Sequence, residues 1–354
     1  MITIALTYRN RDIRIVKKCL DSLHTQTSEE FKVILLDYGS DDKFAKPLKK
    51  LIKAYSFIQL IYCSTQGQLW NKSRAINITL KHSDTPYLLV GDIDMIYRND
   101  FVEFLNKKKK FDKIIYFQVG FLSREESLLS KQFHNYNIKH VSNFEATGIT
   151  LYPTNLLKSI NGYDEFYHGW GAEDTDVHIR LKNAGYKVQF YDTEVLLLHQ
   201  WHPKVYRSSK SKEPYHSYLE KINHQYLQMV ISTKKVMANT TFNWGEFPIE
   251  GKLSIQNALE FSITNQKSEI DAFLYGLLNT IKNKNIYLKI EPHKECMSLK
   301  NNIKKVFNKK TIACYDFKEL NDLILVSIIA QYRNCKYVYE WDKEINIIKL
   351  IIAL

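Results

Sequence analysis

The first hundred residues alternate between short apolar segments and segments with helical spacing. Apolar runs at residues 2–7, 31–36, 57–62 and 87–90 predict four β-strands. Between them, apolar residues recur every three or four positions and predict helices at 13–23, 48–55 and 69–80. Strands separated by helices indicate βαβ units, so we expect an α/β fold with a mostly parallel sheet flanked by helices.

Charged and polar residues follow three of these strands. The fourth strand runs into GDIDMIY at 91–97, where alternation places Asp92 and Asp94 on the same side, as two acids that need a positive partner. Ligands of parallel sheets bind at the carboxyl ends of the strands. The residues that follow the first two strands are Thr7, Arg9, Arg11 and Asp37. Arginine suits phosphate oxygens, and Mg2+ or Mn2+ suits carboxylate and phosphate oxygens together, so this edge predicts a metal-bound diphosphate.

From residue 112 onward the pattern is less regular. Strands are predicted at 113–119, 144–152, 185–191 and 195–202, with a polar stretch at 123–140 and a long helix at 215–237. The segment NWGEFPIEG at 243–251 reads as a linker. We therefore expect a first domain over residues 1–242 and a smaller α/β or α-rich domain over residues 252–354, for which the sequence gives no role.

The net charge of +12 fits a nucleic acid, an anionic membrane surface or a phosphorylated ligand. The basic residues are not interleaved with a recognisable nucleic-acid-binding motif, so no nucleic-acid partner is expected. Five cysteines without CxxC spacing argue against a disulfide framework or a zinc site, and for a reducing compartment. The sequence has no signal-peptide pattern and no apolar run of the ~18–20 residues that a membrane helix needs, so we expect a cytoplasmic protein.

Several motifs occur in the order found in one enzyme family. They are Thr7-Tyr-Arg-Asn-Arg11, Arg74-Ala-Ile-Asn77, Asp92-Ile-Asp94, and Ile160-Asn-Gly-Tyr163 followed by GWGAEDTD at 169–176. They resemble the FRNR, DxD and ING(F/Y)…GWGGEDDD segments of the β-1,4-galactosyltransferases and of related bacterial family 2 galactosyl- and N-acetylgalactosaminyltransferases. The resemblance covers about residues 1–205. It implies a GT-A fold, which is Rossmann-like, and inverting transfer of a sugar from a UDP-sugar.

The resemblance also implies roles for single residues. Asp174 is implied as the base that takes the proton of the acceptor hydroxyl, and the positive end of the helix that begins there favours its ionised form. Trp170, Gly171 and Glu173 are implied to contact the sugar or the acceptor. The residues expected to bind the donor nucleotide are Thr7, Arg9, Arg11, Asp37, Arg74 and Asp92.

A divalent metal would neutralise the charge that builds on the leaving diphosphate. The resemblance implies Asp94 as one metal ligand and takes another from the region of His199 and His202, whose i, i+3 spacing matches a ligand pair of the family. Both histidines are candidates, and His199 is favoured because it directly follows the predicted strand. Histidine ligands favour Mn2+ over Mg2+.

The sequence departs from the family at three positions. Ala172 and Thr175 replace a glycine and an aspartate of the family motif, and Glu145 stands where the family has its donor-selecting aromatic residue. This last change leaves Gal, GalNAc and other sugars open as the transferred group.

The expected function is metal-dependent inverting transfer of a hexose or N-acetylhexosamine, with Gal or GalNAc favoured, to a hydroxyl of a glycan or glycolipid. The expected setting is surface polysaccharide synthesis, in the cytoplasm or peripherally at the inner face of a bacterial membrane. A non-catalytic sugar-binding scaffold is the main alternative, and a basic nucleic-acid-binding protein is a second one. Such a scaffold predicts damaged acids, whereas Asp92, Asp94, Glu173 and Asp174 are all present.

Overall fold

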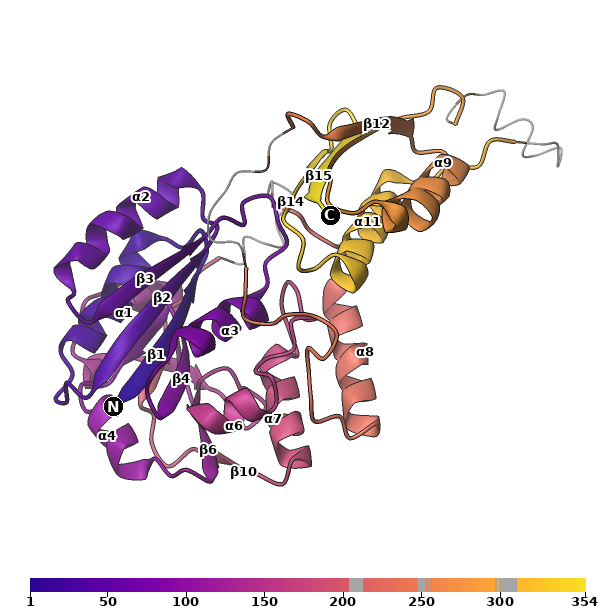
Figure 1. Ribbon diagram of the computed structural model, residues 1–354. Helices are drawn as coiled ribbons and strands as arrows, with labels where there is room; N and C mark the ends of the chain where they lie inside the picture. The colour runs from indigo at the N-terminus through magenta and orange to yellow at the C-terminus, as the bar shows by residue number, and fades with distance from the viewer. Residues whose placement is uncertain (204–212, 248–252, 254, 297, 299–310) are drawn as a thin grey trace. The chain divides into compact units, whose positions relative to one another are not determined.

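The computed structural model describes residues 1–203, 213–247, 253, 255–296, 298 and 311–354, and the chain forms two compact units (Figure 1). The N-terminal unit comprises Met1–Ser64, Trp70–Lys204 and Glu220–Ile249. The C-terminal unit comprises Thr65–Leu69, Val205–Leu219 and Glu250–Leu354. Two segments from within the first predicted domain, residues 65–69 and 205–219, therefore group with the C-terminal unit.

A seven-stranded sheet forms the centre of the N-terminal unit, in the order β10-β6-β9-β4-β1-β2-β3. Its strands are β1 (Ile2–Tyr8), β2 (Phe31–Tyr38), β3 (Ile58–Cys63), β4 (Tyr87–Asp92), β6 (Lys113–Phe117), β9 (Thr150–Pro153) and β10 (Lys187–Tyr191). The pairings are parallel except those of β9, which runs antiparallel to β4 and β6. The mostly parallel α/β sheet is confirmed, but the strand predicted at 144–152 begins only at Thr150.

Helices cover both faces of this sheet. One face packs against α1 (Ile13–His24), α2 (Asp42–Leu51) and α4 (Phe101–Lys108), which bury Val16, Leu48 and Phe101 there. The other face packs against α3 (Lys72–His82), α6 (Thr154–Ser159) and α7 (Glu173–Asn183). Apolar residues at helical spacing, such as Ile76 and Leu80 of α3, supply these contacts. The helix predicted at 215–237 is the shorter α8 (Leu219–Ser232).

A small second sheet extends from the end of β4. Its order is β5-β11-β7-β8, with strands β5 (Met95–Tyr97), β11 (Leu197–His199), β7 (Gly120–Leu122) and β8 (Ile138–Val141). The stretch predicted as polar and irregular at 123–140 contains α5 (Arg124–Leu128), η2 (Phe133–Asn135) and most of β8. Because β11 pairs antiparallel with β5, residues near 199 lie beside residues near 95.

The C-terminal unit has its own four-stranded sheet, in the order β12-β13-β15-β14. Its elements are β12 (Leu259–Thr264), α9 (Lys267–Asp271), η4 (Ala272–Leu277), η5 (Leu278–Thr280), β13 (Asn285–Glu291), α11 (Phe317–Gln331), β14 (Tyr337–Asp342) and β15 (Ile347–Ala353). Burial alternates along β13, where Ile286, Leu288 and Ile290 face the core. This is the small α/β arrangement expected for the end of the chain.

The segment Thr65–Leu69 is attached to this C-terminal sheet. The carbonyl of Gly67 accepts a hydrogen bond from Tyr339 N (2.8 Å), and Leu69 N donates to the hydroxyl of Tyr337 (2.9 Å). Gly67 has a φ of +73°, and a Cβ there would lie 2.8 Å from Val338 Cγ1. The position therefore needs glycine both for its backbone conformation and for the close approach of β14.

One sequence expectation is corrected here. Cys296 and Cys314, 18 residues apart, form a disulfide with a Cα–Cα distance of 6.2 Å. Spacing along the chain gave no sign of the pair, because the fold rather than a local motif brings the two residues together. Cys314 also forms an isolated antiparallel β-bridge with Gln266. Cys19, Cys63 and Cys335 are free thiols.

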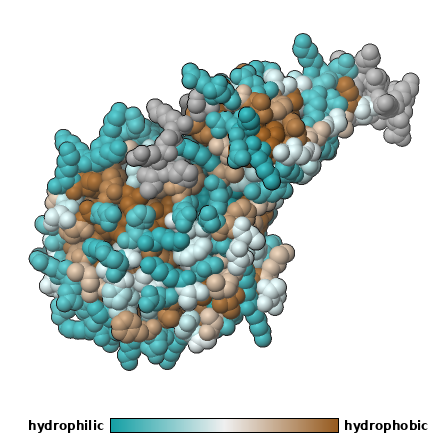
Figure 2. Space-filling model, in the orientation of Figure 1, coloured by the Kyte–Doolittle hydropathy of each residue, from teal (hydrophilic) through white to brown (hydrophobic). Residues whose placement is uncertain are grey.

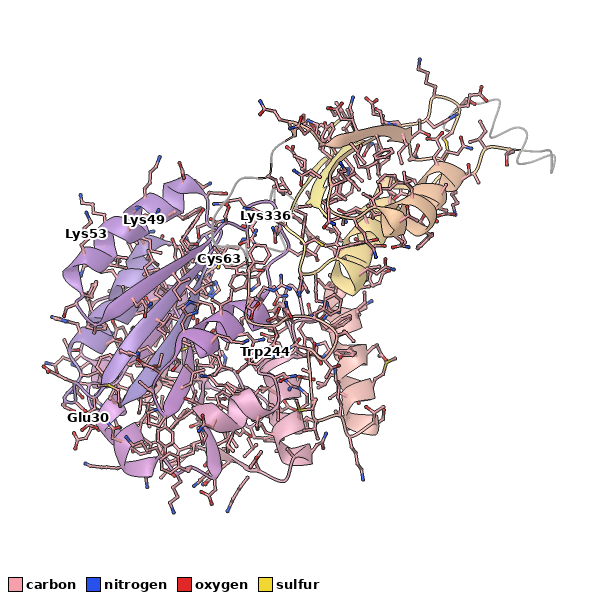
Figure 3. All side chains as sticks on the ribbon, viewed as in Figure 1. Glu30, Lys49, Lys53, Cys63, Trp244 and Lys336 are labelled. Atoms are coloured by element: carbon pink, nitrogen blue, oxygen red, sulfur yellow. A yellow bond between two sulfur atoms is a disulfide. The ribbon has the colours of Figure 1, made fainter. Side chains whose placement is uncertain are left out.

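The surface is largely hydrophilic on the face that Figure 2 shows, with hydrophobic residues gathered in patches on each unit. Much of the positive charge lies on exposed side chains such as Lys49 and Lys53, on the outer side of α2 and the turn η1 (Ile52–Ala54) that follows it (Figure 3). Within the described part of the chain, no helix combines the length and the apolar composition required to cross a bilayer.

Candidate active site

The strand ends that the sequence singled out meet at one edge of the large sheet. The register pairs Thr7 with Asp92 across β1 and β4, and Tyr8 with Asp37 across β1 and β2. Thr7 and Asp37 are buried, with 7% and 1% of their surfaces exposed. The strand ends that carry Thr7, Asp37 and Asp92 therefore meet at one edge of the sheet, as predicted.

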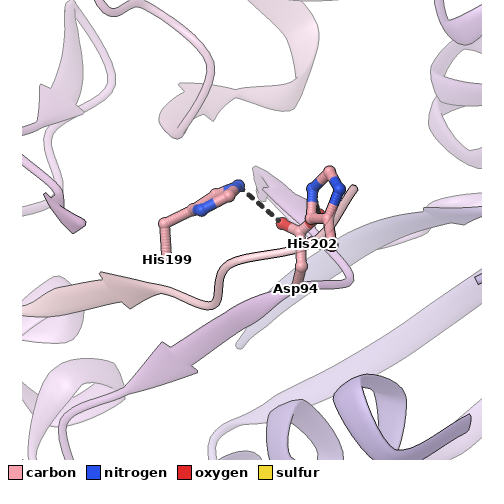
Figure 4. Close-up of side chains that lie close together, drawn as sticks. All are labelled: Asp94, His199 and His202. Carbon is pink, nitrogen blue, oxygen red and sulfur yellow. Dashed lines mark ion pairs between the residues drawn. The ribbon is translucent and has the colours of Figure 1, made fainter. Parts of the chain in front are cut away.

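Asp94, His199 and His202 form a compact cluster beside this edge (Figure 4). One ligand atom of each residue lies within 4.8 Å of the others. His199 Nε2 is 3.6 Å from Asp94 Oδ1, and His202 Nε2 is 3.0 Å from Asp94 Oδ2. The pairing of β11 with β5 places His199 opposite Met95, and Gln200 N donates to the carbonyl of Asp94 (2.9 Å), which holds the two segments together.

The donor set of this cluster fits a divalent transition metal. Asp94 is 4% exposed, and its Oδ1 is buried without a hydrogen-bond partner, so it is available as a ligand. His202 Nδ1 lies 3.2 Å from the carbonyl of Pro203, an acceptor that leaves Nε2 facing Asp94. A carboxylate with two imidazoles favours Mn2+ over Mg2+.

The charges around Asp94 keep it ionised. Burial alone would raise the pKa of Asp94, but His199, His202 and the Arg11 guanidinium, whose Nη2 is 3.3 Å away, hold it below its ordinary value. Burial lowers the pKa of His199, whereas the Asp94 carboxylate acts to raise it. The Arg11 guanidinium thus lies against the cluster of Asp94, His199 and His202.

A second cluster gathers three acids around one lysine. The ammonium of Lys72, the first residue of α3, lies 3.2 Å from Asp92 Oδ1, 3.2 Å from Asp174 Oδ2 and 3.7 Å from Glu173 Oε1. Gly148 lies close to two of the acids, because a Cβ there would be 3.4 Å from Asp174 Oδ2 and 3.6 Å from Asp92 Oδ2. Asp92 therefore belongs to this cluster, while Asp94, two residues later, belongs to the metal cluster.

Asp174 has the electrostatic surroundings of a general base. The pKa of Asp174 is raised to about 7, chiefly by burial and also by the neighbouring Glu173 and Asp92 carboxylates, while Lys72 acts in the opposite direction. Its Oδ1 is buried and has no hydrogen-bond partner. A carboxylate with a pKa near neutrality and an uncommitted oxygen is suited to accept a proton.

The turn that leads into α7 holds Trp170 at the surface. Gly169, Gly171 and Ala172 all have positive φ, at 73°, 103° and 73°. The backbone of this turn is fixed by Asn223 of α8, whose side-chain amide donates to the carbonyls of His168 and Trp170 (2.9 and 3.2 Å). The side chain of Trp170 is 51% exposed, so its ring offers a face to a ligand.

Three acidic or basic residues near the motifs are committed to buried contacts instead. Arg74 is 1% exposed, and its Nε donates to Glu165 Oε2 at 2.7 Å. Asp176 is fully buried, with Oδ2 2.6 Å from Arg180 Nε. Asp37 Oδ1 accepts from the backbone N of Ser40 (2.9 Å).

These contacts distinguish Arg74 from Asp37 among the predicted nucleotide-binding residues. Arg74 points away from the cluster of Lys72 and the three acids. Instead, its partner Glu165 also accepts from Asn77 Nδ2 (2.9 Å) and Gly245 N (2.7 Å), which ties together three distant segments. Asp37 remains at the predicted edge, and burial raises its pKa while the nearby Ser40 and Arg9 counteract this.

Lys72 is the site residue that sequence reasoning missed. The sequence carried one signal for it, since a cation in the first turn of a helix opposes the positive end of the helix dipole. Asn71 caps this helix by accepting from Arg74 N (2.8 Å), so Lys72 stands directly at its start. An unfavourable position of this kind indicates that acids elsewhere in the fold compensate the charge.

Two parts of the chain match the models of known protein families. Residues 3–158 match the model of glycosyl transferase family 2, and residues 128–201 match a model described as the N-terminal domain of galactosyltransferase. The teichoic acid poly(glycerol phosphate) polymerase of Staphylococcus epidermidis is 32% identical over 97 residues. That match covers 26% of this chain and 12% of the polymerase.

Several solved structures are similar to this chain at low sequence identity and with TM-scores below 0.5. The crystal structure of S. aureus TarS 1-349 is 13% identical with a TM-score of 0.46, covering 66% of this chain and 64% of that one. GalNAc-T7 with UDP, GalNAc and Mn2+ is 13% identical with a TM-score of 0.48, covering 65% of this chain and 48% of that one. The mannosyltransferase PcManGT from Pyrobaculum calidifontis, in complex with GDP-Man and Mn2+, is 13% identical with a TM-score of 0.42, covering 66% and 72%.

Proposed function

We propose that this chain, whose residues 3–158 match the model of glycosyl transferase family 2, moves a sugar from a UDP-sugar to an acceptor hydroxyl with inversion, and that it depends on a divalent metal. One observation carries the proposal. Asp94 belongs to a cluster suited to a metal, and Asp92, two residues earlier, belongs to the cluster that contains Asp174, a mostly buried carboxyl with a pKa of about 7. A nucleotide-sugar transferase needs both parts side by side.

The residues of each cluster have distinct tasks in this proposal. Asp94, His199 and His202 would hold Mn2+, which supplies charge stabilisation for the leaving diphosphate. Arg11, already against Asp94, contributes a guanidinium suited to phosphate oxygens, with Arg9 and Thr7 from the same strand end. Asp92 is proposed to contact the donor.

The acceptor side is assigned to the start of α7. Asp174 takes the proton from the acceptor hydroxyl as that oxygen attacks the sugar carbon from the face opposite the diphosphate. Glu173 binds a sugar hydroxyl, and Gly171 lets the backbone turn between Trp170 and α7 with a φ of 103°. The exposed ring of Trp170 stacks on a sugar.

The transferred sugar and the acceptor remain proposals drawn from the family resemblance. Gal or GalNAc is the favoured group, because residues 128–201 match the galactosyltransferase model. The proposed acceptor is a glycan or glycolipid of a surface polysaccharide, a class consistent with the name of the S. epidermidis relative. We place the reaction in the cytoplasm or at the inner face of a membrane.

For the C-terminal region we propose an accessory domain over residues 252–354 that handles the acceptor, assembles the enzyme or docks on a membrane surface. Both family models end by residue 201, so neither assigns this region a role. Expression without residues 252–354 tests the boundary, and loss of all folded structure would show that the first domain cannot stand alone.

A screen of UDP-sugars against the full chain tests the function itself. Release of UDP with Mn2+ and an acceptor, abolished by EDTA and restored by Mn2+, is the expected result. Sugar transfer that persists in excess EDTA would remove the metal from the proposal. Binding of UDP-sugars without turnover for every donor and acceptor tried would favour the sugar-binding scaffold.

A further inference from the structure

Lys72 makes the contacts that link the donor side of the site to the proposed base. Its ammonium lies 3.2 Å from both Asp92 Oδ1 and Asp174 Oδ2. Asp92 belongs to the Asp92-Ile-Asp94 motif, and Asp174 belongs to the GWGAEDTD motif at 169–176. Only 14% of the Lys72 side chain is exposed, so its attraction to these acids is weakly screened by solvent. A cation held this close favours the ionised form of the neighbouring carboxyls and so lowers their pKa.

We propose that Lys72 is a positioning residue that keeps Asp174 ionised and holds its carboxylate in place through Oδ2, so that Asp174 can accept the acceptor proton. This inference rests on the proposed function of Asp174. In the reaction the acceptor oxygen forms a bond to the sugar carbon, and the bond from that carbon to the diphosphate oxygen breaks. The bonding electron pair leaves with the diphosphate, and the acceptor proton moves to Asp174.

The groups that surround Asp174 set its pKa, and Lys72 is one of them. Asp92 from the end of β4 and Glu173 from α7 repel a negative charge on Asp174, and Lys72 from α3 attracts it. The hydroxyls of Tyr152 on β9 and Tyr163 before α7 complete its surroundings and bond to each other at 3.0 Å. Burial raises the pKa of both tyrosines, so they stay neutral at neutral pH. Lys72 is thus the cation that offsets two acids.

Removing the charge of Lys72 has a defined consequence for pH dependence. Asp174 works as a base only when deprotonated, so the transfer rate rises with pH through its pKa. Without Lys72, burial and the two acids act unopposed and the pKa rises. The acidic limb of the rate profile should therefore move to higher pH by about 1–3 units, the range by which a nearby opposite charge shifts a carboxyl.

The test compares Lys72→Gln, Lys72→Arg and Lys81→Gln in the full chain with Mn2+ and a UDP-sugar that the wild type turns over. Lys81 lies on the same helix but is exposed and pairs with Glu246, so Lys81→Gln is a matched control for lost charge. The expected result is a limb shifted upward in Lys72→Gln, restored by Lys72→Arg and unchanged in Lys81→Gln. A Lys72→Gln profile that is lower at every pH but not shifted would overturn the inference.

Infrared titration gives a second readout that needs no donor, acceptor or turnover. The protonated carboxyl band that Asp174→Asn removes reports the pKa of Asp174 directly, in the wild type and in Lys72→Arg or Lys72→Gln. We expect a higher pKa in Lys72→Gln, and an equal pKa in all three proteins refutes the role of Lys72. If Lys72→Gln does not fold, Lys72→Arg decides: a profile and a carboxyl pKa like those of the wild type support the inference, and a carboxyl pKa raised despite the retained charge refutes it. If the wild type shows no transfer, the proposed function fails, while this titration still decides the effect of Lys72.

Discussion

Asp174→Asn separates catalysis from stability more sharply than any other substitution in the site. Asparagine keeps the shape of the side chain but cannot accept the proton. If Asp174 is the base, transfer should fall by about 10²–10⁴, the usual contribution of such a group. Because Mn2+ is expected at Asp94 and the histidines, its affinity should change little.

The structure also predicts the stability of this variant. The surroundings of Asp174, chiefly its burial, raise its pKa to about 7, well above the ordinary value of an aspartate, so the protonated form is more favoured in the folded state than in the unfolded state. A group of this kind contributes stability at low pH that is lost as the pH rises through 7. Asparagine removes that loss. Asp174→Asn should therefore unfold at the same temperature as the wild type or higher above pH 7, although it is nearly inactive.

Asp176→Asn is the matched comparison, two residues further along α7. Asp176 and Arg180 are fully buried with a 2.6 Å contact, and removing one partner of such a pair costs about 3–5 kcal/mol. We expect this variant to lose thermal stability and to retain turnover per folded molecule. Initial rates at saturating acceptor, together with thermal unfolding by circular dichroism, measure both effects. A normal rate in Asp174→Asn with a folded but inactive Asp176→Asn would place the base at Asp176 and refute the reasoning.

Three further predictions concern the metal ligands, Arg11 and the backbone conformation of Ala172. Asp94→Ala should abolish Mn2+ binding by calorimetry and sugar transfer, while His199→Ala and His202→Ala should each weaken Mn2+ binding; unchanged binding in all three would exclude this cluster. Arg11→Ala should weaken UDP binding by about 1.5–3 kcal/mol, the worth of a charge-assisted contact, and calorimetry with an unaltered Kd would move the diphosphate elsewhere. Ala172→Gly should raise the stability of the fold by about 1 kcal/mol, because Ala172 has a φ of 73° that glycine adopts without strain; a lower unfolding temperature would contradict this.

The sequence predicted most of what depends on short stretches of chain. Alternating strand and helix patterns gave the parallel sheet, and the rule that ligands bind at strand ends placed Asp92, Asp94 and Arg11 at one edge. Both histidine candidates lie beside Asp94, because the strand that carries His199 pairs with the one that follows Asp94. The disulfide and the extra strands of the small sheet depend on contacts between distant segments, which no local pattern encodes.

Helix geometry explains why Arg74 and Lys72 have different partners. The motif Arg74-Ala-Ile-Asn77 drew attention to Arg74. However, each residue of a helix turns by about 100°, so side chains two positions apart point about 160° apart, toward nearly opposite sides. Lys72 and Arg74 therefore cannot face the same ligand. The structure directs Lys72 to Asp92 and Asp174 and buries Arg74 against Glu165. Which of two basic residues on one helix faces a site is set by the packing of that helix on the sheet.

The two acids of the GDIDMIY stretch show the same limit at a smaller scale. Strand alternation predicted that both would face one side and need one positive partner. The strand ends at Asp92, so alternation no longer governs Asp94 in the turn that follows. Asp92 then pairs with Lys72, and Asp94 pairs with Arg11 and the histidines. Each acid thereby serves a different part of the proposed reaction, one beside the base and one at the metal, and the spacing of two residues keeps those parts within reach of a single donor.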